Sequence, residues 1–195
     1  MVDRGASNRG RLVVFSAPSG TGKSTVARQV LDLIENLEFS VSATTRPKRE
    51  GEQEGVAYYF LTREAFEAAI RTGGFIEHEF FFGNYYGTLL DKTLNAIEAG
   101  RHLLFDIDVK GALNIKRLFR ERALLVFLKP PSMEVLKQRL EGRQSEGAAA
   151  LQERLERAAM ELDFADRFDV VVVNDDLERT VETVTARIKE FLSQS

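Results

Sequence analysis

The sequence predicts an α/β protein in which a parallel β-sheet is flanked by helices. Short apolar runs without polar alternation are typical of strands that are covered on both faces. Segments of helical length separate these runs, so strands and helices alternate as in βαβ units. The expected strands are Leu12–Ser16, Leu103–Asp106, Leu124–Leu128 and Val170–Val173, with a shorter fifth at Phe39–Val41.

The expected helices are supported by apolar faces and by residues that favour helix ends. Thr62 and Ser132 are suitable N-caps, because their hydroxyl oxygens can accept hydrogen bonds from amides of the first turn. Gly73-Gly74 and Gly100 can end helices, since glycine readily adopts the left-handed conformation found there. The helices are expected at Lys23–Ile34, from Thr62 to Gly73 with Phe66 and Ile70, at Lys92–Ala99, Gly111–Phe119, Met133–Leu140 and Thr180–Leu192.

Two stretches, residues 42–60 and 141–147, break this alternation with charged, glycine and turn residues. Long irregular segments in a compact domain are usually functional or disordered. In an open α/β sheet, ligands gather at the carboxyl ends of the strands. Functional residues are therefore expected just after Ser16, Asp106 and Val173, and within the two irregular stretches.

Composition excludes several classes of protein. A chain of 195 residues with 44% hydrophobic and 29% charged residues can build one substantial core. The net charge of −3 argues against a partner that is nucleic acid, and the absence of cysteine excludes disulfides and thiolate metal sites. The apolar runs are too short to span a membrane, and residues 1–10 lack an apolar signal region. A cytoplasmic location is expected, whereas the oligomeric state is left open.

A glycine-rich segment after the first expected strand predicts a site for nucleotide phosphates. Gly20 and Gly22 allow backbone amides to converge on phosphate oxygens, and the following helix directs its N-terminus at the same anion. Lys23 would reach the β- and γ-phosphates, and Ser24 would ligate Mg²⁺. The alternative is a glycine-rich turn with a solvated lysine, which the flanking strand and helix disfavour. The segment consists of Ala17, Pro18, Ser19, Gly20, Thr21, Gly22, Lys23 and Ser24.

A basic stretch predicts a second phosphate site. Arg46, Lys48 and Arg49 place three cations within four residues of a slightly acidic chain. Arginine binds phosphate through a planar pair of donors, so two arginines can clamp a dianion. Tyr58 and residues 83–88 add hydroxyl donors. The alternative is a solvated basic loop with core tyrosines, but beside a nucleotide loop an acceptor-phosphate clamp is favoured.

The motifs together resemble the guanylate kinase family from about Leu12 to Phe191. They are Ala-Pro-Ser-Gly-Thr-Gly-Lys-Ser, Ser-Val-Ser-Ala-Thr-Thr-Arg-Pro-Lys-Arg, Phe-Ile-Glu-His, Gly-Asn-Tyr-Tyr-Gly-Thr, Asp-Ile-Asp-Val-Lys-Gly and Val-Asn-Asp-Asp. The resemblance implies a phosphate-loop NTPase fold over residues 10–194. Its parts would be a core (10–38, 100–130 and 160–194), a small mixed β/α insertion that binds GMP (42–90) and a helical lid (about 139–157).

The resemblance also implies a reaction and its residues. The reaction is transfer of the γ-phosphoryl group of MgATP to GMP or dGMP. GMP phosphate would be held by Arg46, Arg49, Tyr58 and Tyr86, and guanine would be read by Ser42, Glu77, Thr88 and Asp108. ATP would be bound by the glycine-rich segment and Asn174, with Asp106 near the metal and in contact with it through water. The residues expected to act in catalysis are Lys23, Arg49, Arg143 and Arg154, and Arg139 is a further candidate in the lid.

The chemistry of guanine agrees with these roles. One carboxylate such as Glu77 can accept both the N1–H and the exocyclic amino donors, while the hydroxyls of Ser42 and Thr88 can donate to O6. Asp106 and Asp108, two residues apart on an expected strand, would face the same side. The acceptor phosphate is largely a dianion at neutral pH, with a second pKa near ~6, so no general base is needed.

The histidines and two departures from the family pattern also bear on this interpretation. His78 and His102 are expected to be structural, since neither has an obvious activating partner. Lys110 stands where Gln is frequent in the family, and Ala43 where Ser is frequent.

Two alternative functions compete with this interpretation. They are a phosphopeptide-binding module like those of membrane-associated scaffold proteins, and a phosphotransferase for another nucleotide or a phosphorylated sugar. The intact glycine-rich segment argues against the first, and the base-reading set against the second.

Overall fold

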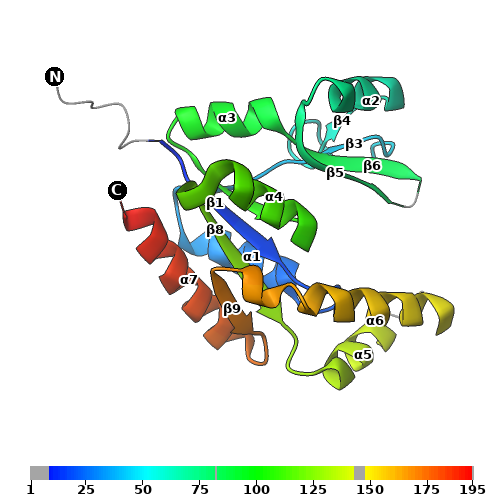
Figure 1. Ribbon diagram of the computed structural model, residues 1–195, viewed down its shortest axis with the longest axis vertical. Coiled ribbons are helices and arrows are strands. Elements are labelled where there is room, and N and C mark those ends of the chain that lie inside the picture. Colours follow the sequence, from blue (N-terminus) through cyan, green and yellow to red (C-terminus); the bar gives the residue numbers. More distant parts are fainter. Residues whose placement is uncertain (1–8, 82, 143–147, 195) are drawn as a thin grey trace.

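The main sheet is parallel and carries helices on both faces, as predicted (Figure 1). The computed structural model describes residues 9–81, 83–142 and 148–194. The strand order of the main sheet is β2-β7-β1-β8-β9, and every neighbouring pair runs parallel. The strands are β1 (Leu12–Ser16), β2 (Leu37–Phe39), β7 (His102–Asp106), β8 (Ala123–Lys129) and β9 (Val170–Val173). The predicted strand at Phe39–Val41 therefore lies two residues earlier in the structure.

Strand β1 lies at the centre of the sheet and directs alternate side chains into two cores. Leu12 and Val14 belong to the core beneath helices α3 (Leu90–Glu98) and α4 (Val109–Phe119). Val13 and Phe15 belong to the core beneath α1 (Lys23–Leu33) and α7 (Leu177–Ser193). All five residues of β1 are buried, so the chain that follows Ser16 starts from a fixed point.

Strand β9 differs from the expectation that every strand of the main sheet is covered on both faces. Val171 and Val173 are 41% and 47% exposed, while Val170 and Val172 pack against one of the two cores. The reason is position, because β9 is an edge strand that pairs with β8 alone. A run of four valines does not reveal that only one of its faces is covered.

A second sheet is built from residues between β2 and β7. It has four strands in the order β4-β3-β6-β5, in which β5 and β6 form an antiparallel hairpin. Helix α2 packs on it through Phe66, which stacks between Phe75 and Tyr85. Much of residues 42–60 has no regular structure, as predicted. The elements are β3 (Ala43–Thr44), β4 (Tyr59–Phe60), α2 (Arg63–Arg71, capped by Thr62), β5 (Phe75–Phe81) and β6 (Asn84–Leu89).

Helices α5 (Met133–Glu141) and α6 (Ala148–Leu162) lie between β8 and β9 in the chain and pack on each other. Ser132 caps α5 as predicted. The pair projects from the same side of the main sheet as the small sheet (Figure 1). Two short 3-10 turns, Arg120–Arg122 and Ala165–Arg167, complete the fold. Among the described residues, no helix is both long and apolar enough to cross a bilayer.

Candidate active site

The glycine-rich loop connects β1 to α1 and needs glycine at two positions. Gly20 and Gly22 have φ values of 88° and 98°, which side chains rarely adopt. A Cβ atom on Gly22 would also lie 2.8 Å from Nδ2 of Asn174. The amide of Thr21 donates to the carbonyl of Pro18 at 3.1 Å and closes the turn. The loop thus presents its backbone at the N-terminus of α1, where an anion is favoured.

Lys23, Ser24 and Asp106 converge where β1 and β7 end. The ammonium of Lys23 forms an ion pair with Asp106 and donates to the carbonyl of Ile107 at 3.2 Å. The hydroxyl of Ser24 donates to Oδ2 of Asp106 at 3.3 Å. The predicted phosphate-binding lysine and the two predicted metal-site residues are therefore neighbours. A hydroxyl and a carboxylate are oxygen ligands that suit Mg²⁺.

No cluster of three or more histidine or acidic side chains suited to a metal occurs in the described part of the chain. Mg²⁺ in nucleotide enzymes is usually bound by one or two protein groups and by substrate phosphates rather than by a cage of protein ligands.

Asn174 and Arg139 brace the glycine-rich loop from the other side. Nδ2 of Asn174, a buried side chain, donates to the carbonyl of Thr21 at 2.7 Å. Arg139, on α5, donates to the same carbonyl at 3.2 Å and to the carbonyl of Asn174 at 3.4 Å. Arg154 lies on α6, and Arg143 falls outside the described residues. Thus Arg139, a candidate lid arginine, contacts the glycine-rich loop.

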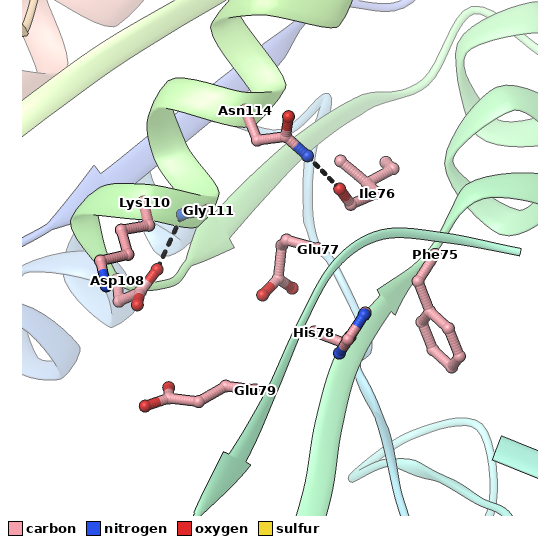
Figure 2. A pocket seen from close by; sticks show the side chains of 9 residues that line it. All are labelled: Phe75, Ile76, Glu77, His78, Glu79, Asp108, Lys110, Gly111 and Asn114. Carbon is pink, nitrogen blue, oxygen red and sulfur yellow. Dashed lines mark hydrogen bonds between the residues drawn. The ribbon is translucent and has the colours of Figure 1, made fainter. Parts of the chain in front are cut away.

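A cavity of about 560 Å³ separates β5 from the N-terminus of α4 (Figure 2). Two of the predicted guanine readers, Glu77 and Asp108, line it. Figure 2 shows Glu77 and Glu79 directed to the side of β5 on which Asp108 lies. The lining residues are Phe75, Ile76, Glu77, His78, Glu79, Asp108, Lys110, Gly111 and Asn114. His78, expected to be structural, and Lys110, a departure from the family pattern, are thus both at this cavity.

Glu77 is held by Thr88 on the neighbouring strand. These residues are partners in the β5–β6 register, and the Thr88 hydroxyl donates to Oε1 of Glu77 at 2.6 Å. Burial raises the pKa of Glu77, the charge of Asp108 acts in the same direction, and the hydrogen bonds from Thr88 oppose both. Thr88 itself is buried and is not among the cavity-lining residues. Its hydroxyl therefore orients the carboxylate.

Asp108 is the N-cap of α4 rather than part of a strand, because β7 ends at Asp106. Its Oδ1 accepts a hydrogen bond of 2.7 Å from the Gly111 amide. The expectation that Asp106 and Asp108 share one face of a strand is therefore wrong. Asp106 contacts the glycine-rich loop, while Asp108 lines the cavity beside Glu77. The turn from strand to helix separates the two carboxylates and assigns one to each site.

The basic stretch forms a loop whose charges are partly paired. Arg46 makes two hydrogen bonds with Glu52, of 3.1 and 2.6 Å, and its guanidinium lies 5.4 Å from the ring centre of Tyr58. Tyr58 in turn meets Tyr86 edge to face at 6.0 Å. Glu52 also accepts from the backbone amide of Arg49 at 2.8 Å. Three of the predicted phosphate ligands are therefore close together, and Glu52 holds the loop around Arg46.

Glu52 was not predicted as a site residue, although it is close to Arg46 in the sequence. The hydrogen bond between the two side chains is the main cause that raises the pKa of Arg46 and lowers that of Glu52. Gly51, with φ of 83°, allows the turn that brings Glu52 back to Arg46. Ser42 has no place among the cavity-lining residues, and its carbonyl accepts from the amide of Tyr59 at 2.9 Å.

The glycine-rich loop between strand and helix is one candidate site, and the cavity between the small sheet and α4 is the other. Together they define a phosphate-loop phosphotransferase with two substrate sites. Residues 9–191 match the sequence profile of the family described as guanylate kinase. A guanylate kinase of Chlorobaculum tepidum is 68% identical over 96% of both chains, and one of Salinibacter ruber is 50% identical over 93% of this chain and 97% of the other.

A solved structure gives the same result. The crystal structure of guanylate kinase from Anaplasma phagocytophilum has a TM-score of 0.74 to this chain at 34% identity, covering 96% of this chain and 89% of the other. The chain belongs to the guanylate kinase family.

Proposed function

We propose that the two sites carry the phosphoryl transfer of this family, from ATP to GMP, giving ADP and GDP. The observation that carries the choice of acceptor is Glu77, a carboxylate that lines the cavity and is oriented by Thr88. Guanine presents adjacent N1–H and amino donors, which one carboxylate can accept together. Adenine presents an acceptor at N1, which would face the same carboxylate unfavourably.

For the donor, we propose that residues 17–24 hold the phosphates of ATP and that Lys23 contacts the β- and γ-phosphates. Ser24 and Asp106 would hold Mg²⁺, Asp106 through water, and the ion neutralises phosphate charge when it is bound. The contacts that link Lys23, Ser24 and Asp106 support this assignment. Asn174 would lie at the adenine end.

For the acceptor, we propose that Arg46, Arg49, Tyr58 and Tyr86 bind the phosphate of GMP or dGMP. The phosphate dianion would compete with Glu52 for Arg46, so binding exchanges one charge-assisted pair for another. Guanine would be read by a set consisting of Ser42, Glu77, Thr88 and Asp108. Thr88 can serve this set through Glu77, because its hydroxyl hydrogen is already directed at that carboxylate.

We propose that catalysis comes from position and charge rather than from a general base. The acceptor phosphate, with a second pKa near ~6, is largely a dianion at neutral pH and needs no deprotonation. Lys23 and Arg49, together with Arg143 and Arg154 of the lid, would stabilise charge on the transferring group. Closure of the insertion (42–90) and the lid (139–157) over the core would exclude water that could hydrolyse ATP.

A cytoplasmic location fits the absence of cysteine.

The acceptor is tested by steady-state phosphorylation of GMP, dGMP, AMP, UMP and dTMP with ATP and Mg²⁺. We expect kcat/KM for GMP to exceed that for AMP by about 10⁴-fold, the scale at which buried polar groups discriminate between bases. Equal use of AMP and GMP would contradict the assignment of the cavity to guanine. Omission of Mg²⁺ should abolish turnover of every acceptor.

A further inference from the structure

Helix α6 reaches the acceptor cavity through one arginine that none of the assignments above uses. Nη2 of Arg157 lies 3.3 Å from Oε1 of Glu79 on β5, and its Nε donates to Oε1 of Glu161, one turn further along α6, at 3.1 Å. A single guanidinium thus joins α6, which carries the last part of the proposed lid, to the small sheet. Residues 79 and 157 are far apart in the sequence, so this link depends on how the two parts are placed.

Glu79 is well placed to affect the guanine pocket. It lies two residues beyond Glu77 on β5, and both side chains line the cavity from the same side of the strand (Figure 2). An ion pair at Glu79 therefore restrains the segment of β5 that carries Glu77. The guanidinium of Arg157, on α6, forms such an ion pair.

The charges around Arg157 connect the two substrate sites. Glu161 is largely buried; burial raises its pKa, and the charges of Arg157 and Lys23 oppose that rise. Burial of Arg157 disfavours its charge, but Glu161, Glu79 and Asp108 raise the pKa of Arg157 overall. The guanidinium therefore stays charged among carboxylates that belong to the acceptor cavity and to α6.

We propose that Arg157 is a positioning residue for the acceptor, which holds Glu79 of β5 against Glu161 of α6 and so keeps the guanine pocket in register with the donor site. This inference rests on the proposed acceptor, a guanine nucleotide. Arg157 and Glu79 are both 41% exposed, and ion pairs of this exposure contribute little to stability. The effect of breaking the pair should therefore be on acceptor binding, while the melting temperature hardly changes.

The test is a double-mutant cycle of Arg157→Gln and Glu79→Gln, with KM for GMP, KM for ATP, kcat and the melting temperature as readouts. Each single variant should raise KM for GMP about two- to five-fold, the scale of a partly exposed ion pair, with kcat and KM for ATP unchanged. The double variant should have no higher KM for GMP than Arg157→Gln, because both substitutions remove the same pair between residues 157 and 79. Arg157→Gln also removes the pair with Glu161, so it alone should lower the melting temperature.

The matched control is Arg187→Gln, which breaks an exposed ion pair with Glu190 on α7 at 3.1 Å. It should leave all readouts unchanged. At 1 M salt, the ratio of KM for GMP between Arg157→Gln and the wild type should approach one, because screening weakens the pair in the wild type and acts equally on phosphate binding in both proteins; a role in packing alone would leave the ratio unchanged.

Three results would overturn the inference. They are additive effects of the two substitutions, an unchanged KM for GMP, and a loss confined to kcat or to KM for ATP, which would place Arg157 at the donor phosphates. If Arg157→Gln does not fold, Glu79→Gln and Arg157→Lys carry the same test. Turnover of GMP by the wild type tests the proposed function separately, since only the ratios between variants and wild type bear on Arg157.

Discussion

The hydroxyl of Thr88 donates a hydrogen bond of 2.6 Å to the carboxylate of Glu77 across the β5–β6 hairpin. This bond favours the ionised form of a carboxyl whose pKa burial raises. An ionised Glu77 is the form that can accept two donors from guanine. Under the proposed function, the small sheet supplies both Glu77 as the base-reading group and the hydrogen bond that orients it and opposes the rise of its pKa.

Thr88→Val keeps the shape of the side chain and removes the hydroxyl. Glu77 would then be less well oriented and its pKa would rise further, so we expect KM for GMP to increase about tenfold, the scale of a hydrogen bond to a charged group. KM for ATP should not change. Steady-state kinetics measure both.

Thr185→Val is the control for that substitution, because Thr185 is also buried and its hydroxyl has no partner in the structure. It should leave both KM values unchanged. An equal rise of KM for GMP in the two variants would show that Thr88 acts through general packing.

Gly111→Ala should disturb the acceptor cavity. A Cβ atom at this position would lie 3.0 Å from Cγ of Glu77 and 3.2 Å from Oδ1 of Asp108, so it would push the two carboxylates apart. The same shift would weaken the N-cap bond from the Gly111 amide to Asp108, which offsets the helix preference of alanine. We expect a severalfold higher KM for GMP in steady-state kinetics, with KM for ATP unchanged. An unchanged KM for GMP would contradict the assignment of this cavity to the acceptor.

Lys23→Ala should abolish most of the turnover while the protein stays folded. The ammonium would stabilise charge on the transferring group, and loss of one such donor lowers kcat by about 10²- to 10³-fold. Circular dichroism would check the fold, and Lys189→Ala, an exposed lysine on α7, is the control. Near-normal turnover of Lys23→Ala would remove this lysine from the mechanism.

His102 predicts a loss of stability in mild acid. Its Nδ1 accepts a hydrogen bond of 2.9 Å from the Arg11 amide, and burial, with the charge of Arg11, lowers its pKa from the ordinary 6.5. The unfolded chain therefore takes up a proton at higher pH than the folded chain. The stability that neutral His102 contributes is present above about pH 6.5 and is lost as the pH falls through the lowered folded pKa.

Urea unfolding between pH 7.5 and 5 measures this effect. The free energy of unfolding should fall with pH more steeply for the wild type than for His102→Gln, which cannot titrate. Arg187→Gln, which changes only an exposed ion pair on α7, is the control and should keep the wild-type slope. Parallel slopes for wild type and His102→Gln would contradict the prediction.

The strand, the loop and the helix caps that are formed by neighbouring residues could be predicted from the sequence. The apolar run before Ala17 and the glycines after it correctly predicted a strand, a loop and a helix, and the caps at Thr62 and Ser132 were identified correctly. These features depend on residues close together in the chain, so a pattern of a few residues predicts them.

Contacts between distant elements were not predictable in this way. Nothing in the spacing of Asp106 and Asp108 reveals that the strand ends between them, so that Asp106 contacts Lys23 while Asp108 lines the cavity. The pair between Glu79 and Arg157 likewise depends on how α6 lies against β5. Such features require the three-dimensional arrangement of the elements.

The most direct test of the central claim is the binding of GMP and of an ATP analogue to Glu77→Gln by titration calorimetry. Glutamine keeps the shape of the side chain but replaces one acceptor oxygen with a donor amide, which would face the donors of guanine. We predict that GMP affinity falls by about 10²-fold or more while affinity for the ATP analogue stays within twofold of the wild type. Unchanged GMP affinity, or a loss confined to the ATP analogue, would contradict the assignment of Glu77 to guanine.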